Sequence, residues 1–380
     1  MFLLETQKFQ SQGLDTISAL YKAVELINKK VGTPKNVIFA TSCSKIEDIT
    51  KIIYEAFPDS TTMGIYTFMY HNSVVSEDSV SLFVFEEDDD AVTVTGLIEH
   101  VSICPVKSIA LIEDSIMKVA PDQEDTICIE FTTGGEEMLV STLNAAFGHF
   151  NIPLIGGTAN ASHKGMVTAV IYNGVIYKDA CIYLLMKNKL GRIKVFSENI
   201  FKKYNNKLHF ATKVDLDSKA LIEIDGKPAA EVLSKEINIP VTELAKYPMK
   251  YPLGRFVGDS SFIIGYHDIG KDGTLYNYKQ VNLNDIIYVM EASDYKEIFS
   301  QSVSTLKSYF ENIGFILSID CINRYTLYKN DNYFEEYANE WYKAFGHHFG
   351  LVSAGEQFCR QHINQAMVCA VFETIRPVIL

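Results

Sequence analysis

The chain has 380 residues, with 34 Lys and Arg against 47 Asp and Glu, so its formal net charge is −13 at pH 7. Its 22 Gly and 10 Pro are too few for a disordered or collagen-like chain, and the length predicts two or three folded domains. The acidic balance offers no basic stripe for phosphates, so we expect neither a nucleic acid nor a membrane as a partner.

The N-terminus, Met1–Leu4, is apolar for too few residues to be a signal peptide, and no segment is long and apolar enough to span a membrane. The 7 Cys are widely spread and form no Cys-x-x-Cys pair. We therefore expect reduced thiols in apolar surroundings, a cytoplasmic location and no structural zinc ribbon.

The first half of the chain begins with alternating strands and helices. Ser44, with Glu47 three residues later, predicts a capping box that opens a helix before Pro58. The Asn173-Gly174 pair predicts a two-residue hairpin. In chain order we expect helices over 14–30, 44–57, 106–119 and 134–150, and strands over 35–42, 62–69, 81–85, 91–98, 126–131, 152–157, 166–172, 175–186 and 192–196.

A polar, lysine-rich stretch over 198–218 predicts a domain boundary. Beyond it we expect a hairpin around Asp272-Gly273, built from 261–266 and 274–278. We also expect strands over 221–224, 286–290, 315–319, 351–353 and 365–372, and helices after Pro228 and over 294–310 and 332–345. The predicted fold class is α/β (α+β): two domains, 1–205 and 206–380, each with a mixed or largely antiparallel sheet flanked by helices.

Familiar catalytic strings, such as a nucleophile elbow or a phosphate-binding loop, are absent. Gly134-Gly135-Glu136-Glu137 is superficially similar to the signature of diguanylate cyclases. We interpret it instead as the end of a strand and the start of a helix, where an acidic pair suits the positive end of the helix dipole.

The segment Gly156-Gly157-Thr158-Ala159-Asn160 is a candidate binding turn. Two glycines let backbone amides approach a ligand closely, and Thr158 and Asn160 add hydrogen-bonding side chains. The alternative is a turn that needs positive φ, with these polar groups satisfying the local backbone.

Two further polar sites lie in the last quarter of the chain. Arg324 follows an apolar strand, and its guanidinium can hold a carboxylate in a bidentate pair, unless it forms a salt bridge. Glu356 can accept a ligand ammonium group, and His362 and Asn364 can orient polar ligand atoms. Alternatively, these residues only terminate and cap the closing strands.

Two kinds of chemistry remain open at the same place. Cys359 with His362 is similar to half of a nucleophile–base pair. A zinc site built from His347, His348, His362 and Glu356 is a further alternative. Because neither set has a recognised spacing, we expect no catalytic residue, no metal and no cofactor.

Five segments together resemble the FIST domain family. Residues 152–186 resemble the close of its N-terminal half, and Asp225–Pro228 resembles the "DGKPA" segment at the entry to its C-terminal half. Tyr251–Gly254, Cys321–Arg324 and Gly350–Phe372 follow in the family's order.

This resemblance implies a sensory module that binds a small ligand, with amino acids as the suggested class. Such modules often accompany chemoreceptor, kinase or cyclic-dinucleotide outputs. The positions that match the family pattern are Gly156, Gly157, Arg324, Glu356 and Asn364. Two departures are Ala366, where many members have Thr, and a short segment between Glu356 and His362.

The leading prediction is a non-catalytic, two-domain sensor for an amino acid or related metabolite, which passes its signal to a separate protein. In it Arg324 binds the ligand carboxylate, Glu356 binds the ammonium, and the Gly-Gly segment supplies backbone donors. One alternative is an enzyme that acts on a small polar metabolite through Cys359 and His362. Another is an interaction scaffold that uses the acidic run 86–90.

Overall fold

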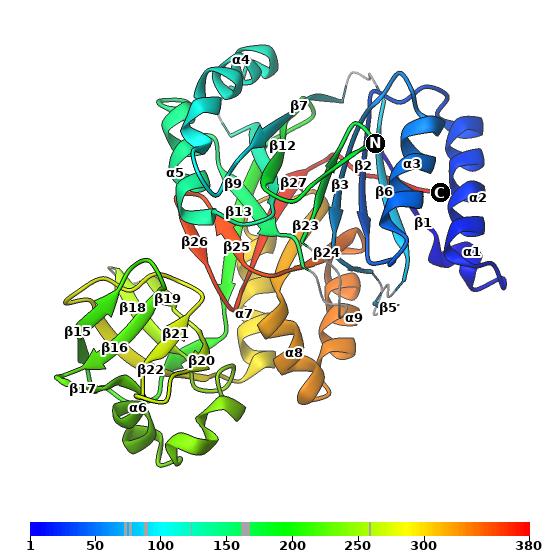
Figure 1. Cartoon of the computed structure of the whole chain (residues 1–380). Coiled ribbons are helices and arrows are strands. Elements are labelled where there is room, and N and C mark those ends of the chain that lie inside the picture. The colour runs from blue at the N-terminus through cyan, green and yellow to red at the C-terminus, as the bar shows by residue number, and fades with distance from the viewer. Residues whose placement is uncertain (72–73, 76–77, 87–89, 123, 161–167, 258–259) are drawn as a thin grey trace.

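The structure is a computed structural model that describes residues 1–380 except 72–73, 76–77, 87–89, 123, 161–167 and 258–259. Most of the acidic run 86–90 and the start of the strand predicted over 166–172 therefore lie outside the described residues. Four sheets flanked by helices make up the described chain, which confirms the α+β class (Figure 1).

A seven-stranded sheet carries both chain ends, in the order β11-β10-β3-β2-β6-β1-β28. Helices α2 and α3 bury their apolar faces against one side of it. The capping box predicted for α3 is wrong, because Lys45 is the N-cap residue and none of the described side chains caps this end. The elements are β1 (Phe2–Glu5), α1 (Gln7–Gln10), α2 (Thr16–Lys30), β2 (Asn36–Thr41), α3 (Ile46–Ala56), β3 (Thr61–Tyr66), β6 (Val80–Phe85), β10 (Val170–Tyr172), β11 (Val175–Tyr177) and β28 (Val378–Ile379).

A six-stranded sheet, in the order β26-β25-β9-β8-β12-β7, is covered on one face by helices α4 and α5. As predicted, Gly134 and Gly135 lie between a strand and a helix, with Glu136 and Glu137 in the first helical turn. The elements are β7 (Ala91–Glu99), the 3-10 helix η1 (Pro105–Ser108), α4 (Ile109–Val119), β8 (Thr126–Thr132), α5 (Glu136–Phe147), β9 (Leu154–Thr158), β12 (Ala180–Asn188), β25 (Glu356–Phe358) and β26 (Gln361–Ile363).

A second six-stranded sheet has the order β13-β27-β23-β24-β4-β5 and packs against aromatic-rich helices. The sequence did not predict helix α8, which begins directly after β23 and contains Arg324. The elements are β4 (Met69–His71), β5 (Val74–Val75), β13 (Ile193–Asn199), α7 (Tyr295–Lys307), β23 (Ile313–Cys321), α8 (Ile322–Asn330), α9 (Phe334–Phe345), β24 (His348–Ser353) and β27 (Ala366–Glu373).

The nine-stranded sheet with helix α6 forms a separate lobe, the small lobe, spanning residues 201–292 (Figure 1). The predicted hairpin is partly wrong: β21 pairs with β20, whereas β19 pairs with β18. The elements are β14 (Phe201–Lys203), β15 (His209–Asp215), β16 (Ala220–Ile224), β17 (Lys227–Pro228), α6 (Ala229–Ile237), the 3-10 helix η2 (Val241–Lys246), β18 (Leu253–Val257), β19 (Ser260–Ile263), β20 (Tyr266–Ile269), β21 (Leu275–Asn277) and β22 (Ile286–Ala292).

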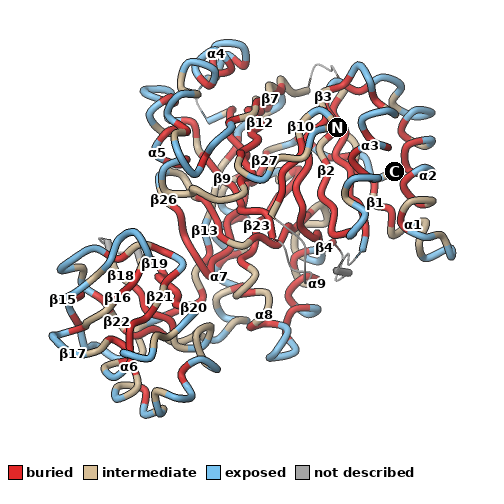
Figure 2. The backbone as a smooth tube through the Cα atoms, in the orientation of Figure 1, coloured by how far each residue is buried: buried red, intermediate tan, exposed pale blue. Residues whose placement is uncertain are grey.

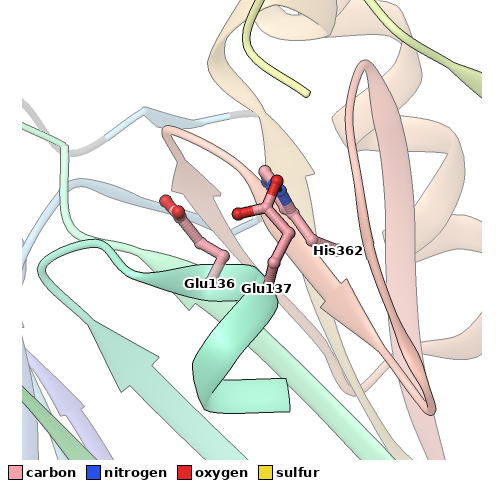
Figure 3. A group of neighbouring side chains, drawn as sticks. All are labelled: Glu136, Glu137 and His362. Atoms are coloured by element: carbon pink, nitrogen blue, oxygen red, sulfur yellow. Dashed lines mark ion pairs between the residues drawn. The ribbon is translucent and has the colours of Figure 1, made fainter. Parts of the chain in front are cut away.

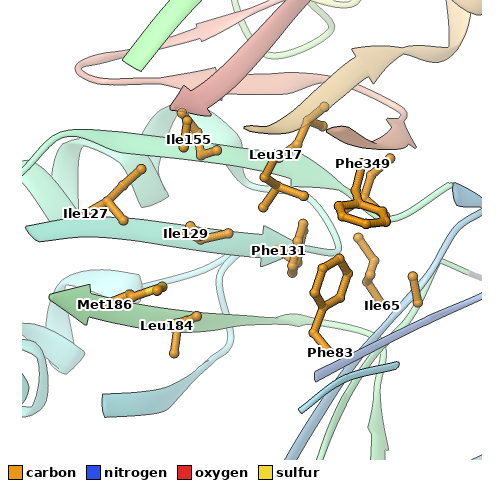
Figure 4. Close-up of a cluster of buried hydrophobic side chains, with 14 of the residues drawn as sticks. Ile65, Phe83, Ile127, Ile129, Phe131, Ile155, Leu184, Met186, Leu317 and Phe349 are labelled. Atoms are coloured by element: carbon orange, nitrogen blue, oxygen red, sulfur yellow. The ribbon is translucent and has the colours of Figure 1, made fainter. Parts of the chain in front are cut away.

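Strands from the two ends of the chain share sheets. β1 pairs with β28, β4 with β24, β9 with β25 and β13 with β27. The seven-stranded sheet and the two six-stranded sheets enclose one apolar core, in which Phe83, Phe131 and Phe349 come from different sheets (Figure 4). The strands in the middle of the main body consist mostly of buried residues, while exposed residues lie on the outer sides of the helices (Figure 2). The division into 1–205 and 206–380 stays a prediction.

Among the described helices, none is both long and apolar enough to cross a membrane.

Candidate functional site

Buried polar atoms without a hydrogen-bond partner gather around β9 and the β25–β26 hairpin. Native proteins satisfy about nine in ten such groups, so a local excess marks a place where a ligand or ion can bind. In the described residues these atoms include Glu130 Oε1, Asn160 Nδ2, Glu198 Oε2, Glu356 Oε2, Gln357 Oε1, both ring nitrogens of His362, Asn364 Nδ2 and both side-chain amide atoms of Gln365.

Strand pairing brings most of the predicted site residues to this place. Gly156 and Gly157 lie opposite Gln357 and Glu356, and Gln357 lies opposite His362 across the hairpin. The glycines are inside strand β9 and neither has positive φ, so the predicted turn is wrong.

Close packing explains both glycines. A Cβ atom on Gly156 would lie 2.2 Å from Glu130 Oε1, and one on Gly157 would lie 2.8 Å from Ser353 Cβ. Because β8 pairs with one edge of β9 and β25 with the other, the backbone here already takes part in the sheet.

The two faces of this sheet carry different groups. Glu356 lies on the core face, where its carboxyl accepts a hydrogen bond of 2.8 Å from Ser353 Oγ. Burial raises the pKa of Glu356 well above its usual value. The role predicted for Glu356, binding a ligand ammonium, stays a prediction.

Thr158 and His362 lie on the opposite face, beside the first turn of α5. Thr158 Oγ1 donates to Glu136 Oε1 at 2.9 Å, and His362 Nδ1 lies 3.5 Å from Glu137 Oε1. Asn160, just beyond β9, donates its backbone N–H to the Tyr66 carbonyl. The predicted binding roles of Thr158, Asn160 and His362 are untested by this geometry.

Arg324 lies in a fully buried ion-pair network. Its guanidinium pairs with Glu198 Oε1, and its Nε lies 3.2 Å from Asp320 Oδ1. The rings of Tyr328 and Tyr337 flank the guanidinium, with centroids 4.9 and 5.3 Å from Cζ. Protein carboxylates already neutralise Arg324, so the role predicted for it requires a ligand carboxylate to displace one of them.

A cavity of about 110 Å³ lies between the small lobe and the main body. A single water needs roughly 10–15 Å³, so this space admits a small molecule. Glu198 and Asn364 line it, and each has one unpaired polar atom, Oε2 and Nδ2. The other lining residues are Ser197, Asn199, Ser261, Phe262, Ile263, Phe358, Ile363 and Ala366.

Glu136, Glu137 and His362 form a second polar group, in which one ligand atom from each lies within 4.8 Å of the others (Figure 3). Burial opposes ionisation of Glu137, but the neighbouring His362 ring and the charge of Lys219 outweigh it and lower the pKa of Glu137 to about 2.

The cysteine and histidines of the alternative predictions lie in different surroundings. Burial raises the pKa of the Cys359 thiol, opposite to the shift that activates a nucleophile. His348 is fully buried and lies 2.8 Å from Ser318 Oγ. The histidine pair His347-His348 forms no metal-ligand group with His362 in the described parts of the chain.

Sequence reasoning missed Glu198, Gln357 and Glu137 as site residues. The sequence pattern explains Glu137 by the helix dipole alone, and Glu198 follows a predicted strand whose neighbours in the sheet the sequence does not indicate. The sequence contains one local signal for Glu198, which is an acidic residue at the end of a largely apolar strand. Such a residue needs a partner when it is buried.

Two comparisons with known proteins bear on this architecture. The FIST N domain matches residues 36–227, half of the chain. An uncharacterised protein from Methanocaldococcus jannaschii is 23% identical over 349 residues, and the match covers 84% of this chain. The chain spans 66% of that relative's length, just under two thirds. The resemblance of the segments beyond residue 227 to the C-terminal half of the family stays a prediction. The chain belongs to the FIST family of sensory domains.

Proposed function

We propose that this protein is a cytoplasmic sensor that binds an amino acid or a related small amine in the cavity between the small lobe and the main body. The observation that carries the proposal is that Glu198 lines this cavity while its buried carboxylate oxygen Oε2 has no hydrogen-bond partner among the described residues. Membership in a family of sensory domains supports a ligand-binding role.

The cavity offers complementary groups for such a ligand. Glu198 Oε2 accepts hydrogen bonds from a ligand ammonium, while Asn364 Nδ2 donates to a ligand oxygen. Phe262, Ile263 and Phe358 provide apolar walls around these two polar groups. A mainly apolar pocket with a few convergent polar groups is typical of small-molecule sites.

In this proposal Arg324 acts through Glu198 rather than on the ligand. The Arg324 guanidinium holds Glu198 Oε1, which leaves Oε2 directed to other partners. Arg324 is therefore a positioning residue. This proposal differs from the sequence-based prediction at one point, because the partner of the ligand ammonium is Glu198 in place of Glu356.

The place of the cavity suggests how binding becomes a signal. Phe262 and Ile263 belong to the small lobe, whereas Glu198 and Asn364 belong to the main body. A ligand that contacts both lobes favours the relative placement in which both contacts form. The surface so created is available to a separate output protein, such as a kinase, chemoreceptor or cyclic-dinucleotide enzyme.

A thermal-shift screen with the common amino acids and small amines tests this function. At a hundredfold excess over its dissociation constant, a ligand adds about 2.7 kcal/mol of stability, a shift of several degrees. Hits are then measured by calorimetry on Glu198→Gln and Asn364→Ala, with Asn205→Ala, in an exposed loop, as the matched control.

We expect both cavity variants to lose binding at least tenfold and the control to bind as the wild type. Ala366→Phe, which fills the cavity without removing a polar group, is expected to abolish binding as well. A ligand that binds all three cavity variants as tightly as the wild type refutes this site, and a screen without any hit refutes the ligand class.

A further inference from the structure

We propose that Glu136, Glu137 and His362 form a binding site for a divalent first-row transition-metal ion. This site lies on the α5 face of the sheet and is separate from the cavity of the proposed sensor function. The three residues come from two segments far apart in sequence, the first turn of α5 and strand β26 (Figure 3).

The spacing of the three side chains is close to what a metal ion needs. One ligand atom from each residue lies within 4.8 Å of the others. With bond lengths of about 2.1 Å, ligand atoms around a tetrahedral ion are roughly 3.4 Å apart. The ligand atoms must therefore approach one another by at most about 1.4 Å, which side-chain rotation can supply, to form three bonds to one ion.

His362 supplies the independent observation. Its side chain is only 4% exposed, and neither ring nitrogen has a hydrogen-bond partner among the residues that the structure describes. Glu137 Oε1 lies 3.5 Å from its Nδ1. A buried imidazole usually satisfies both nitrogens, so an unpaired ring that faces two carboxylates has the features of a metal ligand without its metal.

Surrounding groups hold the carboxylate of Glu136 in place. Gln357 Nε2 donates to Thr158 Oγ1 at 3.2 Å, and Thr158 donates in turn to Glu136 Oε1 at 2.9 Å. Hydrogen bonds of this kind orient ligating carboxylates in metal sites. Gly355 leaves room for the imidazole, since a Cβ there would lie 2.8 Å from His362 Nε2.

Lys219 competes with the proposed metal. Its Nζ lies 3.3 Å from both carboxylate oxygens of Glu137 and is the cation that now balances this carboxylate. A bound dication takes over that role, so removal of the lysine charge is expected to tighten metal binding. The positive end of α5 also opposes a cation, and the two carboxylates in its first turn offset this effect.

The ligand set indicates the class of metal. One imidazole with two carboxylates suits Mn²⁺, Fe²⁺, Co²⁺ or Zn²⁺, whereas Mg²⁺ and Ca²⁺ prefer oxygen ligands alone. Solvent completes the coordination, because Glu136 and Glu137 are only partly buried.

The test is titration of the purified, metal-free protein with Co²⁺ and Zn²⁺, followed by calorimetry and by the visible absorption of Co²⁺. His362→Gln and the double variant Glu136→Gln/Glu137→Gln remove ligands. Glu335→Gln/Glu336→Gln is the matched control, because these two residues are likewise consecutive glutamates in the first turn of a helix.

We expect one ion to bind per chain, with binding lost in both ligand variants and kept in the control. Thr158→Val is expected to weaken binding about tenfold, as for other outer-shell changes, and Lys219→Met to strengthen it. The proposal is overturned if the wild type binds neither ion, if His362→Gln binds as well as the wild type, or if Lys219→Met binds more weakly. Circular dichroism of each variant confirms its fold before titration.

Discussion

Arg324 provides the sharpest test of how this fold is held together. Its side chain is 0% exposed and lies between the carboxylates of Glu198 and Asp320. Arg324→Met keeps most of the volume but leaves two buried carboxylates without a cation. Breaking a buried pair from one side costs about 3–5 kcal/mol, because an uncompensated charge remains in the interior.

The size of the chain converts this cost into a melting shift. Unfolding entropy of about 2.1 cal/mol/K per residue gives roughly 0.8 kcal/mol/K for a chain of this length. We therefore expect Tm to fall by about 4–6 °C, measured by calorimetry near pH 8 and checked by chemical denaturation. The matched control is Arg192→Met, since Arg192 is 52% exposed and pairs with Glu373; an exposed pair contributes about 0–1 kcal/mol.

The same variant has an expected pH dependence. Burial raises the pKa of Asp320 to about 6 against the opposing charge of Arg324. Without Arg324 this carboxyl binds a proton more readily in the folded state than in the unfolded state, so acid relieves part of the cost. The loss at pH 5.5 is therefore expected to be smaller than at pH 8. A loss no greater than that of Arg192→Met, or one independent of pH, refutes this reasoning.

Two further predictions concern single buried groups. Burial raises the pKa of Glu5 from 4.5 to about 7, so the folded state binds more protons than the unfolded state between these values and loses stability as pH rises. Glu5→Gln lacks this loss, so its free energy of unfolding is expected to match that of the wild type near pH 4. At pH 8 the variant is expected to be more stable by at most about 3 kcal/mol, measured by chemical denaturation. An equal difference at both pH values contradicts the prediction. Gly156→Ala places a Cβ 2.2 Å from Glu130 Oε1 and is expected to cost about 1–3 kcal/mol, largely recovered in a Glu130→Ala background. Gly32→Ala is the control, because its Cβ has no described atom within 4 Å and it bears only the cost of a left-handed backbone. If the Glu130→Ala background leaves the cost of Gly156→Ala unchanged, the clash is not its cause.

Local patterns in the sequence predicted most helices and strands. The helical spacing over 14–30 corresponds to α2, and the Asn173-Gly174 pair lies between β10 and β11 as a hairpin requires. Gly134-Gly135 ends β8 and precedes α5, as the glycines and the following acidic pair indicated. These features depend on residues that are close together in the sequence. The sequence alone was therefore sufficient to predict them. The order of five weak motifs also sufficed to indicate the family.

Contacts between distant segments were decided only by the tertiary structure. Glu198 meets Arg324 because β13 pairs with β27 beside β23, and no local pattern encodes that order of strands. His362 meets Glu137 because the β25–β26 hairpin adds to the edge of β9 next to α5. Burial then changed the chemistry: Arg324, predicted to bind a ligand, pairs with Glu198 and Asp320 inside the protein, and burial raises the pKa of Glu356 well above its usual value. The sequence by itself determined which residues form each element, whereas the packing of those elements determined which polar groups are left without a partner.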